Sequence, residues 1–210
     1  MLKLNDDKTE VIMFGSRHQL SNIKTLSVKI GETEITPSPI VKNLGVYIDS
    51  QLTMDKHVNH VCRTGRMHLR NISRVRRYLT TDAAKSMVIS LVSSRLDYAN
   101  VILAGVPQAL TDRLQKVQNA GARMITKSSP RCHITPILKE LHWLPIKARI
   151  DYKVLMYTYR ALNGLAPTYV ADILEVYMPS RSLRSESQSL LTTPRTRTKT
   201  FGWQRLAVKA

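Results

Sequence analysis

Five arginines at helical spacing form the pattern in this chain that points most directly to chemistry. They lie three, four, four and three positions apart, at Arg63, Arg66, Arg70, Arg74 and Arg77. On an α-helix these positions fall within about 80° of one another, along about 21 Å of the axis. Because a guanidinium group can donate two parallel hydrogen bonds to a phosphate, such a row suits a nucleic-acid backbone. A solvated face is the alternative, but such faces usually mix signs, since like charges four residues apart repel.

Histidines and cysteines near these arginines do not have the spacing of a metal site. The residues are His57, His60, Cys62 and His68. On one helix His57 and His68 would be about 16 Å apart along the axis, whereas zinc ligands lie about 2 Å from their ion. Cys62 would point about 140° away from His57. Cys132-His133 and His142 have no second cysteine nearby, so the sequence predicts no metal site.

Paired carboxylates for phosphoryl transfer are also not evident. Polymerases hold two metal ions about 4 Å apart between such carboxylates. The possible donors are Asp6-Asp7, Asp49, Asp97 and Asp151, and none forms a pair between apolar strands. Asp6-Asp7 fits a solvated loop, and Asp49 fits a helix N-cap or a turn. Walker, GxSxG and HExxH motifs do not occur in the sequence. We therefore expect this chain by itself not to be an enzyme and to need no cofactor.

The charge of the chain favours a polyanionic partner. Its 210 residues include 32 basic and 15 acidic side chains, a net charge of +17. Residues 51–80 carry seven basic and one acidic side chain, and residues 179–210 carry the same numbers. Nucleic acid is the first choice of partner, an anionic membrane surface is the second, and a ribosomal or histone-like role is the third. Of these we expect nucleic acid and no membrane. The two distant cysteines and the absence of an apolar run of about 18 residues predict an intracellular protein, nuclear or cytoplasmic, neither secreted nor transmembrane.

Residues 1–50 are typical of β-strands. Glu10–Phe14 is a short β-prone run that ends at a glycine. Apolar residues alternate from Leu26 to Ile30, and the following Gly31-Glu32 predicts a turn of a hairpin that returns through Ile35. The run from Val41 to Ile48 predicts one further strand.

From about Thr53 the apolar period becomes helical. The first helix has an apolar face opposite the arginines, formed by Val58, Val61, Cys62, Gly65, Leu69, Ile72 and Leu79. Later helices are predicted after an N-cap at Thr81, over 110–125, after an N-cap at Thr135, from Pro145 to a stop at Gly164, and within 167–177. The segment 179–200 is rich in Ser, Thr, Arg and Pro and predicts a basic disordered tail. The fold class is therefore α+β with helix dominant.

Several strings, in this order, resemble one family. They are Leu4–Glu10, Lys42–Asp49 with Leu52 and His57, Ser94–Tyr98, Leu114–Asn119, His133–Pro136, Leu141–Pro145 and Ser180–Ser185. Together they resemble the region downstream of the catalytic motif in LINE-type, jockey-like non-LTR retrotransposon reverse transcriptases. Each string alone is weak, but the ordered set is specific and covers nearly the whole chain.

The resemblance implies an assignment for each part of the chain. Residues 1–50 would be partial palm strands, 51–130 thumb-like helices beginning with the basic helix, 131–178 connector helices, and 179–210 a flexible, truncated tail. The implied partner is an RNA/DNA template–primer duplex, held by the thumb, and a further partner would be the missing palm and fingers. Lys8 matches a late-palm lysine that assists the incoming nucleotide or the leaving pyrophosphate.

The sequence departs from that family where catalysis would reside. The aspartates of the two upstream palm motifs, one usually written YADD, are not present, and both ends look truncated. Mg²⁺ is implied only for a full-length parent, and Ala99 stands where the family commonly has Cys. We expect a non-catalytic piece of an RNA-directed DNA polymerase that retains backbone binding. The alternatives are a domesticated basic helical module that binds a protein or nucleic acid, and an enzyme that acts only when complemented by the palm.

Overall fold

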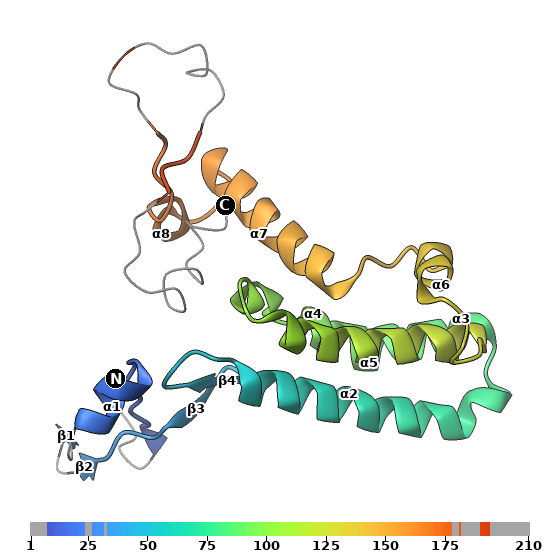
Figure 1. The fold of residues 1–210 in the computed structure, drawn as a ribbon, viewed down its shortest axis with the longest axis horizontal. Coiled ribbons are helices and arrows are strands. Elements are labelled where there is room, and N and C mark those ends of the chain that lie inside the picture. The colour runs from blue at the N-terminus through green and yellow to red at the C-terminus, as the bar shows by residue number, and fades with distance from the viewer. Residues whose placement is uncertain (1–7, 24–26, 32, 178–180, 182–189, 194–210) are drawn as a thin grey trace, which may run out of the picture. The chain divides into compact units, whose positions relative to one another are not determined.

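The computed structural model describes residues 8–23, 27–31, 33–177, 181 and 190–193. Two small antiparallel hairpins near the N-terminus are followed by a succession of helices (Figure 1). This confirms the predicted helix-dominant α+β class. In the described part, no helix is both long and apolar enough to cross a membrane. The chain divides into two compact units, residues 1–60 and 61–210, which are considered separately.

The first unit contains the two hairpins. In the first, β1 (Val28–Ile30) pairs with β2 (Thr33–Ile35), which confirms the predicted hairpin. The predicted single strand over 41–48 is wrong, because the chain reverses within it. β3 (Ile40–Asn43) pairs instead with β4 (Val46–Asp49). The reversal occurs at Leu44 and Gly45, whose φ angles of 45° and 83° are those of a two-residue hairpin turn.

The predicted strand at Glu10–Phe14 is also wrong. This segment is irregular, and the carbonyl of Val11 accepts one hydrogen bond, from the Ser38 amide at 2.7 Å. A β-prone run forms a strand only where a neighbour supplies a ladder of such bonds. The next element is a short helix that the sequence did not predict, α1 (Arg17–Asn22). A reciprocal pair of hydrogen bonds between Ser16 and Gln19 caps it.

The long basic helix forms as predicted, as α2 (Asp55–Val75). Asp49 prepares its start, because its two carboxylate oxygens accept hydrogen bonds from the amides of Thr53 and Met54 at 2.9 and 2.8 Å. Thr53 and Met54 precede α2, so of the two roles expected for Asp49, N-cap or turn residue, these hydrogen bonds confirm the turn. A 3-10 turn, η2 (Arg76–Tyr78), follows α2 directly.

Three helical segments then run without interruption. They are α3 (Thr81–Val88), the π-helical segment η3 (Ile89–Ser93) and α4 (Ser94–Asp97). The predicted cap at Thr81 is displaced by one residue, since the hydroxyl that accepts from the Ala83 amide belongs to Thr80. The chain turns at Ala99, which has a positive φ, into the 3-10 segment η4 (Asn100–Leu103).

The remaining helices pack around one central element. This element is α5 (Gln108–Thr126), which contacts α3, α6 (Ile134–Glu140) and α7 (Ile146–Leu162). α8 (Thr168–Ala171) contacts α7 and is shorter than the helix predicted over 167–177. The predicted limits of α7 are confirmed, because it follows Pro145 and ends before Gly164 at φ 67°.

The N-cap predicted at Thr135 is wrong. α6 begins two residues earlier, and the ring nitrogen Nδ1 of His133 accepts the hydrogen bond from the Thr135 amide. Pro136 therefore lies at the third position of the helix, where its missing N–H would be unpaired in any case. The basic tail predicted over 179–210 lies outside the described residues, apart from Arg181 and 190–193, and part of Leu4–Glu10 also lies outside them.

Candidate nucleic-acid interface

α2 has two faces of opposite character. The apolar face predicted from its sequence is buried at Val58, Val61, Cys62, Gly65, Leu69 and Ile72. Each of the five arginines predicted to bind phosphate is exposed. Arg63, Arg66, Arg70, Arg74 and Arg77 are called the arginine row from here on. Burial of one face fixes which way the other points, so the row faces solvent.

The arginine row makes no ion pair within the described part of the chain. Asp55 is the only acidic residue in α2, and it lies in the first turn. Arg66 is close enough to the buried thiol of Cys62 to influence it. Burial raises the pKa of this thiol, while the charges of Arg66 and Arg113 act in the opposite direction.

Two adjacent arginines at the end of α2 have different environments. The guanidinium of Arg77 is exposed and lies 4.6 Å from the centroid of the Tyr78 ring. Arg77 is in the 3-10 turn rather than in α2, but at about 120° per residue this turn keeps it near the side of the row. Arg76, by contrast, is only 8% exposed.

The buried Arg76 caps the end of another helix. Its guanidinium donates to the carbonyls of Met124 and Ile125, in the last turn of α5, at 2.8 and 2.7 Å. A third hydrogen bond, at 2.8 Å, goes to the carbonyl of Leu79. A cation is favoured at a helix C-terminus, where carbonyls lack partners. The sequence did not predict that Arg76 caps α5, because Arg76 differs from Arg77 only by its position in the chain.

Glycines allow the helices behind the arginine row to approach closely. A Cβ atom added to Gly65 of α2 would lie 2.8 Å from Cγ1 of Val117 on α5. A Cβ atom added to Gly121 of α5 would lie 3.0 Å from Cγ1 of Val88 on α3. Any larger residue at either position would displace its neighbour. The two glycines therefore hold α2, α3 and α5 in a close, specific packing.

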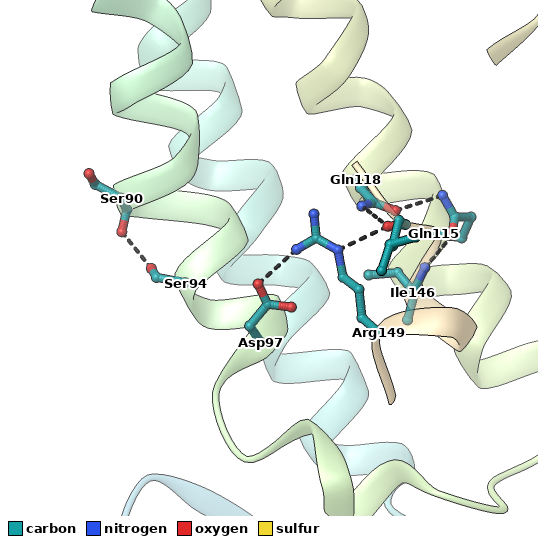
Figure 2. Close-up of polar contacts among 8 residues, drawn as sticks. Ser90, Ser94, Asp97, Gln115, Gln118, Ile146 and Arg149 are labelled. Carbon is teal, nitrogen blue, oxygen red and sulfur yellow. Dashed lines mark hydrogen bonds and ion pairs between the residues drawn. The ribbon is translucent and has the colours of Figure 1, made fainter. Parts of the chain in front are cut away.

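A polar network connects three segments that are far apart in the sequence (Figure 2). Arg149 of α7 pairs with the carboxylate of Asp97 in α4 at 2.7 Å, and its Nε donates to the carbonyl of Leu144. Gln118 of α5, 1% exposed, donates to that same carbonyl at 2.8 Å. The side-chain oxygen of Gln115 accepts from the Ile146 amide at 2.8 Å.

This network brings together strings that carry the family resemblance. Asp97 lies in Ser94–Tyr98, Gln118 in Leu114–Asn119, and Leu144 in Leu141–Pro145. The Trp143 ring lies 5.8 Å from the Arg149 guanidinium. These residues fix the start of α7 against α4 and α5. Their contacts are those of a structural network, and they account for the polar residues of these strings without invoking catalysis.

The other candidate residues each have a local environment of their own. Asp49 holds the turn before α2, Asp97 forms an ion pair, and Asp151 is exposed on α7. Lys8 is exposed at the beginning of the described chain. Within the described residues, no group of three His, Cys, Asp or Glu side chains could hold a metal ion.

The histidines at the start of α2 are packed against a hairpin. The His57 ring is 3% exposed, and its Nδ1 lies 3.5 Å from the Tyr47 amide of β4. Burial lowers the pKa of His57, and the neighbouring His60 lowers it further. The His60 ring lies 4.9 Å from that of Tyr47. His57 is therefore a buried packing residue whose surroundings disfavour the charged form of the ring.

Comparison with known proteins adds no family assignment. No protein-family model, no curated protein and no solved structure matches the chain. The resemblance to non-LTR reverse transcriptases thus stays a prediction, and the residues themselves carry the functional argument.

Proposed function

We propose that the chain binds the sugar–phosphate backbone of a template–primer duplex through the arginine row. We further propose that it corresponds to the late palm, thumb and connector of a non-LTR retrotransposon reverse transcriptase. The observation that carries the proposal is the exposure of five arginines, four on one side of α2 and one in the turn that follows, with no acidic partner in the described part of the chain. The ordered strings of the sequence support the family.

The mode of binding follows from the chemistry of the row. Guanidinium groups distributed along about 21 Å of helix meet successive phosphates and release the counterions that surround them. Such contacts position a duplex without reading base edges, as a polymerase that copies any template requires. The close packing at Gly65 and the cap at Arg76 hold the helix in place while its other face meets the ligand.

The salt dependence of duplex affinity tests this function. A fluorescently labelled RNA–DNA hybrid is titrated with the protein at several salt concentrations, and binding is followed by anisotropy. Five phosphate contacts predict a log–log slope of about −4.5, using the value of about −0.9 per contact for a B-form duplex. Changing all five arginines of the row to Gln should remove most of this slope.

A matched variant separates the arginine row from net charge. Five other exposed basic residues of the second unit are changed to Gln, namely Lys116, Lys127, Arg131, Lys139 and Lys147. Both variants lose five positive charges, but only the first should lose most of the duplex affinity. Equal losses would show that the net charge attracts the duplex without a defined site. Salt-independent binding would refute backbone binding altogether.

Polymerisation is assigned to residues outside this chain. The isolated chain should incorporate no nucleotide on a primed RNA template, with or without Mg²⁺, because it lacks the two aspartate motifs of the palm. Incorporation that survives removal of contaminating polymerases would contradict this assignment. Lys8 is the match to the late-palm lysine, so it should matter for nucleotide incorporation only when a palm is supplied.

A further inference from the structure

α7 has a second, uncovered face in addition to the face that it buries in the bundle. The buried positions are Ile146, Ile150, Val154, Thr158 and Ala161. On another side of the helix Tyr152, Leu155, Tyr159 and Leu162 are 57%, 59%, 63% and 43% exposed. These four residues are spaced by three, four and three positions, so they lie within about 80° of one another. They form a continuous aromatic and aliphatic stripe.

Basic residues run beside the two tyrosines of this stripe. Lys153 and Arg160 each follow a tyrosine by one position, and therefore repeat its seven-residue spacing on the adjacent side of the helix. No ion pair with a carboxylate of the described residues engages either of them. α7 contains four basic residues and one acidic residue, and one of the four, Arg149, is paired with Asp97.

The tyrosines of this region are all exposed. Five of the eight tyrosines in the chain lie between 152 and 177, and each of these five is at least 38% exposed. A tyrosine that served the core would bury its ring. Exposed aromatic rings beside unpaired cations are the combination on which proteins stack unpaired bases while holding the backbone.

We propose that this face of α7 binds single-stranded nucleic acid. Bases pack on the rings of Tyr152 and Tyr159, and the backbone phosphates meet Lys153 and Arg160. The two rings lie about 10.5 Å apart along the axis, which corresponds to about three base steps of 3.4 Å. Leu155 and Leu162 extend the apolar side of the same platform.

Two properties favour a single strand over other occupants. In a duplex the bases are stacked on one another, so their faces cannot reach the tyrosine rings. A protein partner would also cover such a stripe, since tyrosine and arginine are common in protein interfaces. Lysine is depleted there, however, and Lys153 stands next to Tyr152. The site is separate from the arginine row, so either site can exist without the other.

The experiment compares a labelled 12-nucleotide oligo(U) with an abasic strand of the same number of phosphates. Replacing both tyrosines, as Tyr152→Ala with Tyr159→Ala, should weaken oligo(U) binding about 25-fold or more, at about fivefold or more per stacked base. The same double variant should bind the abasic strand as the wild type does. Tyr152→Phe with Tyr159→Phe keeps both rings and should retain most of the affinity.

Other outcomes of these experiments either refute the proposal or support it. If the Ala variant binds oligo(U) like the wild type, stacking on α7 is refuted. If the wild type is a dimer by sedimentation equilibrium, and the Ala variant is a monomer with unchanged oligo(U) affinity, the stripe is a protein interface. Gln variants of the arginine row that lose duplex binding but keep tyrosine-dependent oligo(U) binding support two separate sites. Thermal melting of each variant checks that the exposed substitutions leave the fold intact.

Discussion

Replacing Arg76 should destabilise the second unit, whereas replacing its neighbour Arg77 should not. Arg76 is 8% exposed and donates three hydrogen bonds to carbonyls, two of them in the last turn of α5. Arg77 is exposed and touches only one aromatic ring among the contacts of the described residues. The two positions thus offer the same side chain in two environments, one residue apart.

The expected magnitude follows from these contacts. A hydrogen bond to a charged group contributes about 1.5–3 kcal/mol, but the three bonds of one guanidinium are not additive. Carbonyls in the last turn of α5 can also bind water once the side chain is removed. We therefore expect Arg76→Ala to lower the free energy of unfolding by about 3 kcal/mol. Arg77→Ala should lower it by less than about 1 kcal/mol, the scale of a solvent-exposed cation–π contact.

Urea unfolding followed by circular dichroism at 222 nm measures both values. Arg76→Lys serves as a control and should fall between the wild type and Arg76→Ala. It keeps the charge, but its three N–H donors share one nitrogen, whereas Arg76 reaches the three carbonyls from three separate nitrogens. Duplex binding should change in the opposite sense, because Arg77→Gln removes about 0.9 from the log–log salt slope and Arg76→Gln, where folded, removes none. Equal stabilities of Arg76→Ala and Arg77→Ala would refute the capping role.

Three further predictions concern Gly65, the two cysteines and His57. Gly65→Ala should lower the free energy of unfolding by about 1 kcal/mol, because the overpacking cost of about 1–3 kcal/mol against Val117 exceeds the gain in helix propensity of about 1 kcal/mol. The double variant Gly65→Ala with Val117→Ala should lose less stability in urea unfolding than the sum of the losses of the two single variants. The exposed Cys132 should react with a thiol reagent in the native protein, and the buried Cys62, whose pKa is raised by burial, should react only after unfolding. In the folded protein the pKa of His57 is below its ordinary value of 6.5. The contribution of His57 to stability is therefore complete above about pH 6.5 and decreases as the pH falls below that value. Unfolding midpoints at pH 5 and pH 7 should differ less in His57→Leu than in the wild type.

The sequence predicted those elements whose pattern is long and periodic. The apolar face of α2 repeats over about four turns, from Val58 to Ile72, so both its burial and the exposure of the arginine row could be anticipated. The reversal between β3 and β4 could not, because it requires a leucine, Leu44, to adopt a positive φ that is unfavourable for a β-prone residue. The cap at His133 was similarly displaced from Thr135, since a ring nitrogen replaced the expected hydroxyl.

The site could be predicted only as far as one helix determines it. Spacing placed the arginine row on one side, but it could not distinguish Arg76, which reaches the end of α5, from Arg77. It also did not reveal the exposed stripe of α7. Tyr152 and Tyr159 share a helix with an equally apolar buried face, and only the three-dimensional packing shows which of the two faces is covered. Contacts between distant segments therefore account for what the sequence alone could not supply.

The glycine at position 65 also determines the rotational setting of α2 about its own axis. A residue without a side chain fits against Val117 without displacing it, so this edge of α2 can meet α5 more closely than an edge that carries side chains. A shift of register by one residue would turn the helix by about 100°, which would bring the arginine row toward the bundle. An uncharged residue therefore helps to set the direction in which the five charges face.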